Sequence, residues 1–160
     1  MLGNLENALA LRRTGASLWR GHTDPAYEGH TGMYGGYTAA LLLKAIVSEP
    51  HATGAPSALT VNYVKALPPA SEVEIRTRLL GATRSIQNWT VEVALPGAPD
   101  VSAFASVVMT TRREIDGNIQ PVMPKVPPPE QVDVVTFGSR FGRQSPVRPV
   151  MGMNLDTGSE

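Results

Sequence analysis

Four stretches in the middle of the chain alternate apolar and polar residues with a period of two. One phase of this alternation is occupied by Leu59, Val61 and Tyr63, by Val73, Ile75, Thr77 and Leu79, by Trp89, Val91, Val93 and Leu95, and by Val101, Ala103, Ala105 and Val107. Such spacing is typical of strands that bury one face. The links at 81–85 and 96–99 are short enough for antiparallel hairpins. We therefore predict four half-buried antiparallel strands.

A nearly continuous apolar segment precedes these strands. Residues 36–48 read GYTAALLLKAIVS, in which Thr38, Lys44 and Ser48 are the only strongly polar side chains. Ala and Leu favour a helix, and a helix that is apolar on almost every side needs other elements around it. The segment is too short to cross a bilayer. We predict a central helix that is wrapped by the strands.

One sheet curled around one helix accounts for both patterns, and this α+β arrangement is the hot-dog fold. A lipocalin-like barrel is the alternative, but such a barrel places its helix outside and needs more strands. We expect the hot-dog domain to span residues 15–115. Before it, residues 1–14 are expected to hold a short helix over 4–13, because apolar residues recur there at helical spacing. A further strand is expected near 17–22.

The end of the chain has a different composition. Five prolines fall between Pro121 and Pro129, and proline stiffens the chain and cannot donate to a strand ladder. The last 30 residues are too few to bury a core alone. Residues 116–160 are therefore predicted to be a Pro-rich linker or tail.

Charge and rare residues exclude several functions. Lys plus Arg and Asp plus Glu both number 14, so a basic surface for nucleic acid or anionic lipid is not expected. The absence of Cys excludes disulfides, a Cys nucleophile and a Cys-ligated metal. His22, His30 and His51 are not spaced as paired ligands, so we predict neither a metal nor a cofactor. No membrane span or signal peptide is visible, and a cytoplasmic protein is expected.

The loop before the predicted helix carries the first candidate chemistry. Gly35 and Gly36 stand where the unpaired amides of a helix N-terminus would lie. Glycine allows a carbonyl group to approach closely, so these amides are a candidate oxyanion hole. The same glycines also suit a tight turn into the helix. Asp24, Glu28 and His30 are candidates to orient a water molecule, or are ordinary polar loop residues.

Three segments resemble the thioesterase II-like acyl-CoA thioesterases. Residues 32–43, GMYGGYTAALLL, are similar to that family's Gly-Gly pair and leucine-rich helix start. Residues 57–65, SALTVNYVK, resemble its next strand, and Thr83-Arg84-Ser85 falls where the family tends to have a Gly-Arg-Ser turn. The resemblance covers about residues 18–113. Residues 29–34 also faintly resemble the benzoyl-CoA-type thioesterases, and Asp24 with His30 faintly resembles the hot-dog hydratases. In neither case does the spacing of the residues fit that family.

The resemblance implies a protein of two hot-dog units joined by a linker, of which this chain is similar to the first. It also implies catalysis by an Asp, a Ser or Thr and a Gln, all in the second unit. Here residues 57–66 contain no carboxylate and 101–111 contain no Gln. Only the hydroxyl has a match, in Thr83 or Ser85. Because two of the three groups are missing, hydrolysis by this chain alone is not expected.

These observations give one candidate site and two functional hypotheses. The candidate catalytic groups are Gly35, Gly36, Asn62 and Thr83, with Asn62 orienting water. The candidate substrate contacts are Tyr34, Arg84 and Ser85, with Arg84 against a CoA phosphate. The chain is expected to hydrolyse an acyl-CoA thioester, or else to be a structural or acyl-binding half. Since a lone hot-dog unit exposes an edge strand, we expect a homo-oligomer or pairing with a second hot-dog unit.

Overall fold

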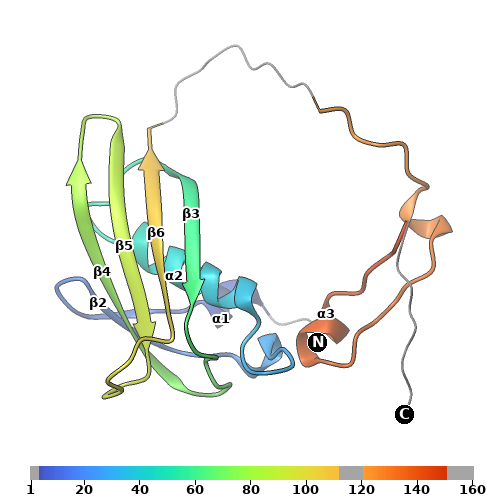
Figure 1. Ribbon diagram of the computed structural model, residues 1–160, viewed down its shortest axis with the longest axis horizontal. Coiled ribbons are helices and arrows are strands. Elements are labelled where there is room, and N and C mark those ends of the chain that lie inside the picture. The colour runs from blue at the N-terminus through green and yellow to red at the C-terminus, as the bar shows by residue number, and fades with distance from the viewer. Residues whose placement is uncertain (1–3, 112–120, 151–160) are drawn as a thin grey trace.

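The computed structural model describes residues 4–111 and 121–150 (Figure 1). Its centre is a six-stranded antiparallel sheet in the order β1-β2-β4-β5-β6-β3. The strands are β1 (Arg12–Gly15), β2 (Leu18–His22), β3 (Ala55–Tyr63), β4 (Glu72–Ala82), β5 (Ile86–Ala94) and β6 (Ala103–Thr110). The helical elements are α1 (Leu5–Ala8), η1 (Pro25–Tyr27), α2 (Gly35–Val47), η2 (Pro129–Gln131) and α3 (Arg140–Gln144). The sheet is open, with β1 and β3 as its edges, so it is not the barrel considered as the alternative.

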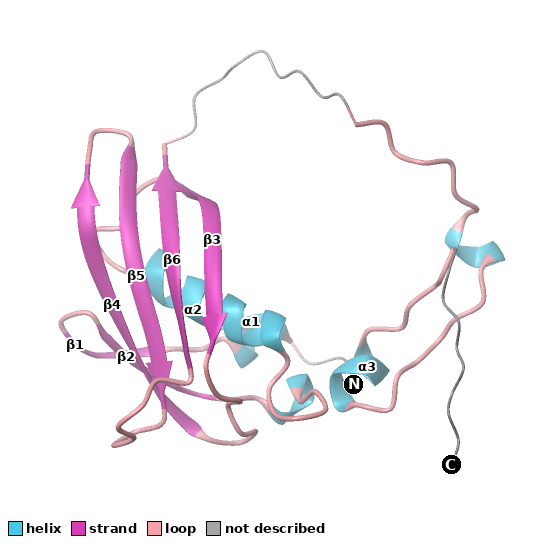
Figure 2. Cartoon of the chain, in the orientation of Figure 1, coloured by secondary structure: helices cyan, strands magenta, loops and turns pink. Residues whose placement is uncertain are grey.

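The core lies between α2 and one face of the sheet (Figure 2). The inward residues of β4, β5 and β6 are buried, namely Val73, Ile75, Trp89, Val91, Val93, Ala103, Ala105, Val107 and Met109. From the helix, the buried residues are Tyr37, Thr38, Leu41, Leu42, Ala45 and Ile46. The small side chains of Ala103 and Ala105 leave room for the helix to approach β6. The period-two alternation in these strands thus corresponds to one core-facing and one outward-facing row of side chains.

The edge strand β3 and one flank of α2 remain open. β3 pairs only with β6, with Leu59 opposite Val107 and Tyr63 opposite Ala103. Leu59 and Tyr63 therefore point to the same face as the core, yet they are 37% and 56% exposed. On the helix, Val47 is 43% exposed. The helix, expected to be wrapped on all sides, packs against the sheet, but the flank that carries Val47 stays exposed.

The N-terminal helix is much shorter than the expected 4–13. Asn4 caps α1 through its side chain, but the helix ends at Ala8, and residues 12–15 form β1 against β2. An isolated helix of this length is only marginally stable in water. Pairing with β2, with Arg13 opposite Trp19, satisfies the backbone better than another helical turn. The expected strand over 17–22 is present as β2.

A buried carboxylate joins α2 to the first hairpin. Glu49 follows the C-terminus of α2 and its side chain is 3% exposed. Its Oε1 accepts hydrogen bonds from Trp19 Nε1 at 2.8 Å and from Thr77 Oγ1 at 2.5 Å. Arg13 Nη2 lies 3.9 Å from Oε2. Buried charges are tolerated only when paired in this way, so Glu49 fixes β2 and β4 against the end of the helix.

We predict that Glu49→Ala lowers the free energy of unfolding by about 3 kcal/mol, because two buried donors lose their acceptor. Glu49→Gln retains one acceptor and should lose about half as much. Urea unfolding followed by circular dichroism measures both. Glu130→Ala, at an exposed position of η2, is the control. A Glu49→Ala protein within about 0.5 kcal/mol of wild type would contradict the assignment.

Candidate functional site

The loop that leads into α2 is held by buried contacts. Thr23 is buried, and its Oγ1 donates to the carbonyl of Pro68 at 2.7 Å. Met33 N donates to the carbonyl of Leu67 at 2.8 Å. Gly32 has φ +143°, and a Cβ there would lie 2.7 Å from the same carbonyl oxygen, so only glycine fits. The start of α2 is thus fixed against the turn between β3 and β4.

Tyr37 anchors the first turn of α2 to the N-terminal segment. Its hydroxyl donates to the carbonyl of Ala8 at 2.8 Å and accepts from Asp24 N at 3.2 Å. Its ring stacks on Tyr27 with centroids 5.1 Å apart. Burial raises the pKa of Tyr37 above its ordinary value, so the hydroxyl stays protonated and keeps donating. The helix start therefore has a fixed position in the fold.

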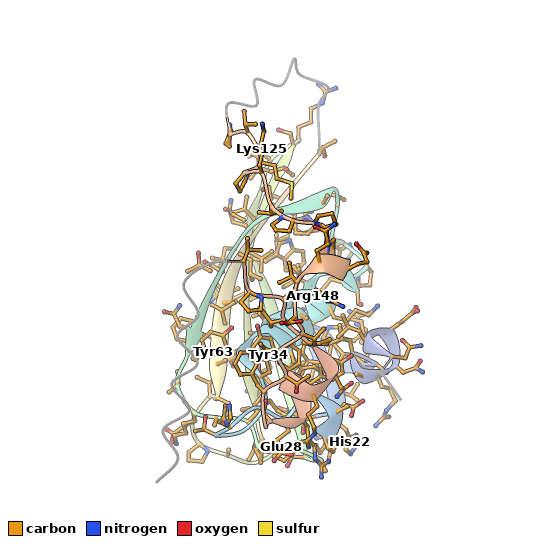
Figure 3. All side chains as sticks on the ribbon, turned by 90° about the vertical axis from the view of Figure 1, so that its right-hand side faces the viewer. His22, Glu28, Tyr34, Tyr63, Lys125 and Arg148 are labelled. Atoms are coloured by element: carbon orange, nitrogen blue, oxygen red, sulfur yellow. The ribbon has the colours of Figure 1, made fainter. Side chains whose placement is uncertain are left out.

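Two further tyrosines lie against the Gly35-Gly36 pair (Figure 3). Tyr63 Oη donates to the carbonyl of Gly35 at 2.8 Å. A Cβ on Gly35 would lie 3.3 Å from Tyr63 Cζ, and a Cβ on Gly36 would lie 2.4 Å from Tyr34 Cε1. Tyr34 is the N-cap residue of α2 but makes no side-chain capping hydrogen bond. A side chain at Gly36 would therefore displace the Tyr34 ring, whereas one at Gly35 would need only a small shift of Tyr63. The amides of the first turn are left without a side-chain cap.

Cavities flank this helix start on both sides. One, of about 460 Å³, is lined by loop residues 29–35 together with residues of the 137–147 segment. The other, of about 240 Å³, is lined by Met33, Thr38, Tyr63 and the residues that follow β3. Among the described residues that line these two cavities there is no Asp or Glu. The helix start can therefore supply hydrogen-bond donors and apolar walls but no carboxylate base.

Asn62 does not lie with Gly35 and Gly36. It is opposite Phe104, which is outward-facing, whereas its neighbour Tyr63 is opposite the buried Ala103. Successive side chains of a strand point to opposite faces. Asn62 is therefore on the outer face of the sheet, away from α2, and Tyr63 occupies the inward position beside the glycines.

The Thr83-Arg84-Ser85 turn is also far from the helix start within one chain. It joins β4 to β5, next to Ile86, which pairs with Thr110, while Tyr63 is at the level of Ala103 and Val93. Ile86 and Val93 are seven residues apart on one strand, which corresponds to about 23 Å. Thr83 Oγ1 is engaged in the turn, where it accepts from Ile86 N at 3.1 Å. Thr83, Arg84 and Ser85 thus form a separate cluster at the other end of the sheet.

The polar loop residues have specific partners. Asp24 Oδ1 accepts from Ala26 N at 2.9 Å and caps η1. Glu28 pairs with Arg140 at 3.4 Å. His30 is exposed and borders the larger cavity, so it is the loop candidate that the structure brings beside Gly35. No group of three or more His, Asp or Glu suited to a metal ion is found within residues 4–111 and 121–150.

Sequence reasoning missed two residues of this region. Tyr63 continues the inward phase of Leu59 and Val61, and this signal could have selected it over Asn62. Phe141, from α3, stacks on Tyr34 with ring centroids 3.9 Å apart and an interplanar angle of 11°. No local pattern pointed to Phe141, because its partner lies more than a hundred residues away in the chain.

Comparison with known proteins defines the class. Residues 23–111 match the acyl-CoA thioesterase N-terminal domain family. Because the match covers more than half of the chain, the chain belongs to this family. The predicted relationship to the thioesterase II group is thereby confirmed. A search of curated proteins found no match.

Solved structures confirm the hot-dog fold. The chain is similar to a conserved hot-dog protein of unknown function from Alicyclobacillus acidocaldarius, with 32% identity and a TM-score of 0.78 over 88% of this chain and 52% of that one. It is also similar to a candidate thioesterase II from Thermobifida fusca, with 21% identity and a TM-score of 0.73 over 86% and 50%. A third is the acyl-CoA thioesterase II TesB2 from Mycobacterium marinum, with 17% identity and a TM-score of 0.65 over 81% and 47%. The chain spans about half the length of these three proteins. None of the helices in the described parts of the chain is long and apolar enough to cross a membrane.

We predict that Tyr63→Phe lowers the free energy of unfolding by about 1 kcal/mol, because the carbonyl of Gly35 loses its hydroxyl donor. Thermal or urea unfolding measures the change. Thr60→Val is the matched control, since it removes a hydroxyl from the exposed outer face of the same strand. Equal stabilities for the two variants would show that the Tyr63 hydroxyl does not hold the helix start.

Proposed function

We propose that this chain is one half of an acyl-CoA thioesterase. The observation that carries the proposal is the start of α2, where the amides of Gly35 and Gly36 have no side-chain cap and Gly35 borders an apolar cavity. A thioester carbonyl oxygen at these amides would gain negative charge as water attacks the carbonyl carbon. Donors that are already fixed stabilise that charge without reorganisation, worth about 3 kcal/mol per donor.

The reaction is ordinary thioester hydrolysis. The water oxygen forms a bond to the carbonyl carbon, a base takes its proton, and the carbon–sulfur bond breaks when the tetrahedral intermediate collapses. The electron pair leaves on sulfur, which takes up a proton to give free CoA. The acid is the other product. This chain contributes the oxyanion donors and the walls of the site.

A second hot-dog unit supplies the base in this proposal. Two features support it: no Asp or Glu lines the described cavities at the helix start, and the chain spans half the length of its relatives. The open edge of β3 is the natural contact, because an unpaired edge strand invites another strand. Antiparallel pairing there would bring the hairpin end of the second unit toward Gly35. Residues equivalent to Thr83, Arg84 and Ser85 would then reach the thioester and the CoA phosphates.

A non-catalytic acyl-binding half is the second candidate. The same lack of a carboxylate around Gly35 favours it. Hydrolysis of an acyl-CoA panel, followed with a thiol reagent, separates the two. The assay is run with the chain alone and with a hot-dog unit that carries the Asp and the Gln. Activity in either arm supports the thioesterase proposal, whereas acyl-CoA binding without turnover in both arms supports the second candidate.

We predict that Gly36→Val reduces turnover by about two orders of magnitude in whichever arm is active, the scale of losing one oxyanion donor. The added side chain would meet Tyr34 and crowd the approach of the carbonyl. Gly81→Val is the matched control, because a Cβ at Gly81 meets nothing within 4 Å. Circular dichroism verifies folding of both. Full activity of a folded Gly36→Val protein would refute the oxyanion assignment.

We expect His30→Ala to change turnover by less than about threefold, because the proposal places the base in the second unit. Initial rates at saturating acyl-CoA measure the effect. A loss of a hundredfold or more would identify His30 as the general base. The chain would then hold its own proton acceptor, and a second unit would not be needed to supply the base.

The edge of β3 is expected to mediate assembly. Leu59→Lys places a charge on the inward side of the edge strand, where it would be buried on pairing but is tolerated in a free chain. We predict that wild type is larger than a monomer in light scattering at micromolar concentration, and that Leu59→Lys shifts it to the monomer mass. Wild type that is monomeric and captures no second hot-dog unit would contradict the pairing.

A further inference from the structure

The C-terminal segment turns back onto the loop that precedes α2. After the Pro-rich stretch, Val135 and Val147 form a two-way backbone bridge, with N···O distances of 2.8 and 2.9 Å. Between them Ser139 is the N-cap of α3, and its side chain accepts from Gly142 N at 3.0 Å. We call residues 135–147 the return segment. Figure 1 shows α3 beside the loop that leads into α2.

The return segment contacts the loop through backbone, charge and aromatic groups. Phe141 N donates to the carbonyl of Glu28 at 3.0 Å, and Arg140 pairs with the Glu28 carboxylate at 3.4 Å. Gln144 Nε2 donates to the carbonyl of Ala26. The Phe141 ring stacks on Tyr34, the residue directly before Gly35. These contacts hold α3 in place against the loop, where it forms one wall of a cavity.

The cavity of about 460 Å³ lies between this wall and loop residues 29–35. Its size is within the range of small-molecule sites, which are mostly apolar with a few polar groups. Met33, Tyr34, Phe137, Phe141 and Val147 supply its apolar side chains. No Lys, Arg, Asp or Glu is among its described lining residues, and its polar side chains are those of His30, Thr31, Ser139 and Ser145. Gly35, at the helix start, forms one boundary.

We propose that this cavity holds the apolar acyl chain of the thioester and that Phe141 forms the wall against which that chain packs. The proposal rests on the proposed function, because it takes the carbonyl oxygen to lie at the amides of Gly35 and Gly36. From that point an apolar chain enters the uncharged cavity, while the charged CoA moiety stays outside. Phe141 forms this wall together with Tyr34, on which its ring stacks and which itself packs over Gly36.

The first test locates the chain without requiring hydrolysis. A thioether, S-octyl-CoA, with a diazirine at the end of the octyl group, is photolysed with the full chain, and the labelled peptides are mapped. Excess unlabelled S-octyl-CoA defines saturable labelling. The expected result is saturable labelling within residues 29–35 and 137–147. Labelling along β3 and the open flank of α2, or none that is saturable, would overturn the proposal.

The second test changes the cavity in opposite directions. Binding of S-octyl-CoA and S-ethyl-CoA is measured by calorimetry. Phe141→Ala removes the wall and should weaken octyl binding about tenfold, whereas Phe141→Leu keeps apolar bulk and should recover most of it. Val147→Phe fills the cavity and should abolish the octyl preference. Ethyl binding should change less than about twofold in all three.

Phe104→Ala is the control, because it removes the same side chain from an exposed position on the outer face of the sheet. Equal octyl affinities for wild type, Phe141→Ala and Val147→Phe would overturn the proposal. So would an equal weakening of octyl and ethyl binding in Phe141→Ala, since that indicates a general loss of structure. Because neither test uses turnover, saturable labelling of the cavity with no hydrolysis leaves this assignment standing and rejects only the thioesterase activity.

Discussion

The burial of α2 against the inward rows of β4, β5 and β6 is the contact on which the other features depend. It creates the core, and it fixes the end of the helix at which Gly35 and Gly36 lie. Tyr37 and Glu49 secure the two ends of the helix to the N-terminal segment and to the first hairpin. Since the helix cannot shift without opening these polar contacts, its first-turn amides keep one orientation. A site built on those amides is preorganised by the core itself.

Local patterns predicted the fold well and the site only in part. The strands and the helix follow from strict alternation and from an apolar segment, because burial selects those patterns directly. The short strand β1 is not predicted from the sequence, since its pairing with β2 is a tertiary contact that overrides a weak helical spacing. Asn62 was chosen over Tyr63 although the strand phase separates their faces. The stacking of Phe141 on Tyr34 left no local trace, because it joins distant parts of the sequence.

The candidate polar groups of the site are divided between the two ends of the sheet. Donors lie at the helix start, whereas the hydroxyls and the arginine of the β4–β5 turn lie at the other end of the sheet. A flat sheet cannot bring its two ends together within one chain. Two units that paired with opposite strand directions would bring unlike ends together. The outer-face arginines have a simpler role, since Arg20 and Arg76 pair with neighbouring glutamates.

The position of β3 in the sheet also has a consequence for the order of folding. β4, β5 and β6 are joined by short turns and pair with their neighbours in sequence, whereas β3 pairs with β6 across about 40 intervening residues. Closing that loop costs entropy that is recovered only after β6 is in place. With few buried side chains of its own, β3 is the strand whose amides are expected to exchange with solvent first. An edge strand that opens readily is thus the one that a second unit would protect.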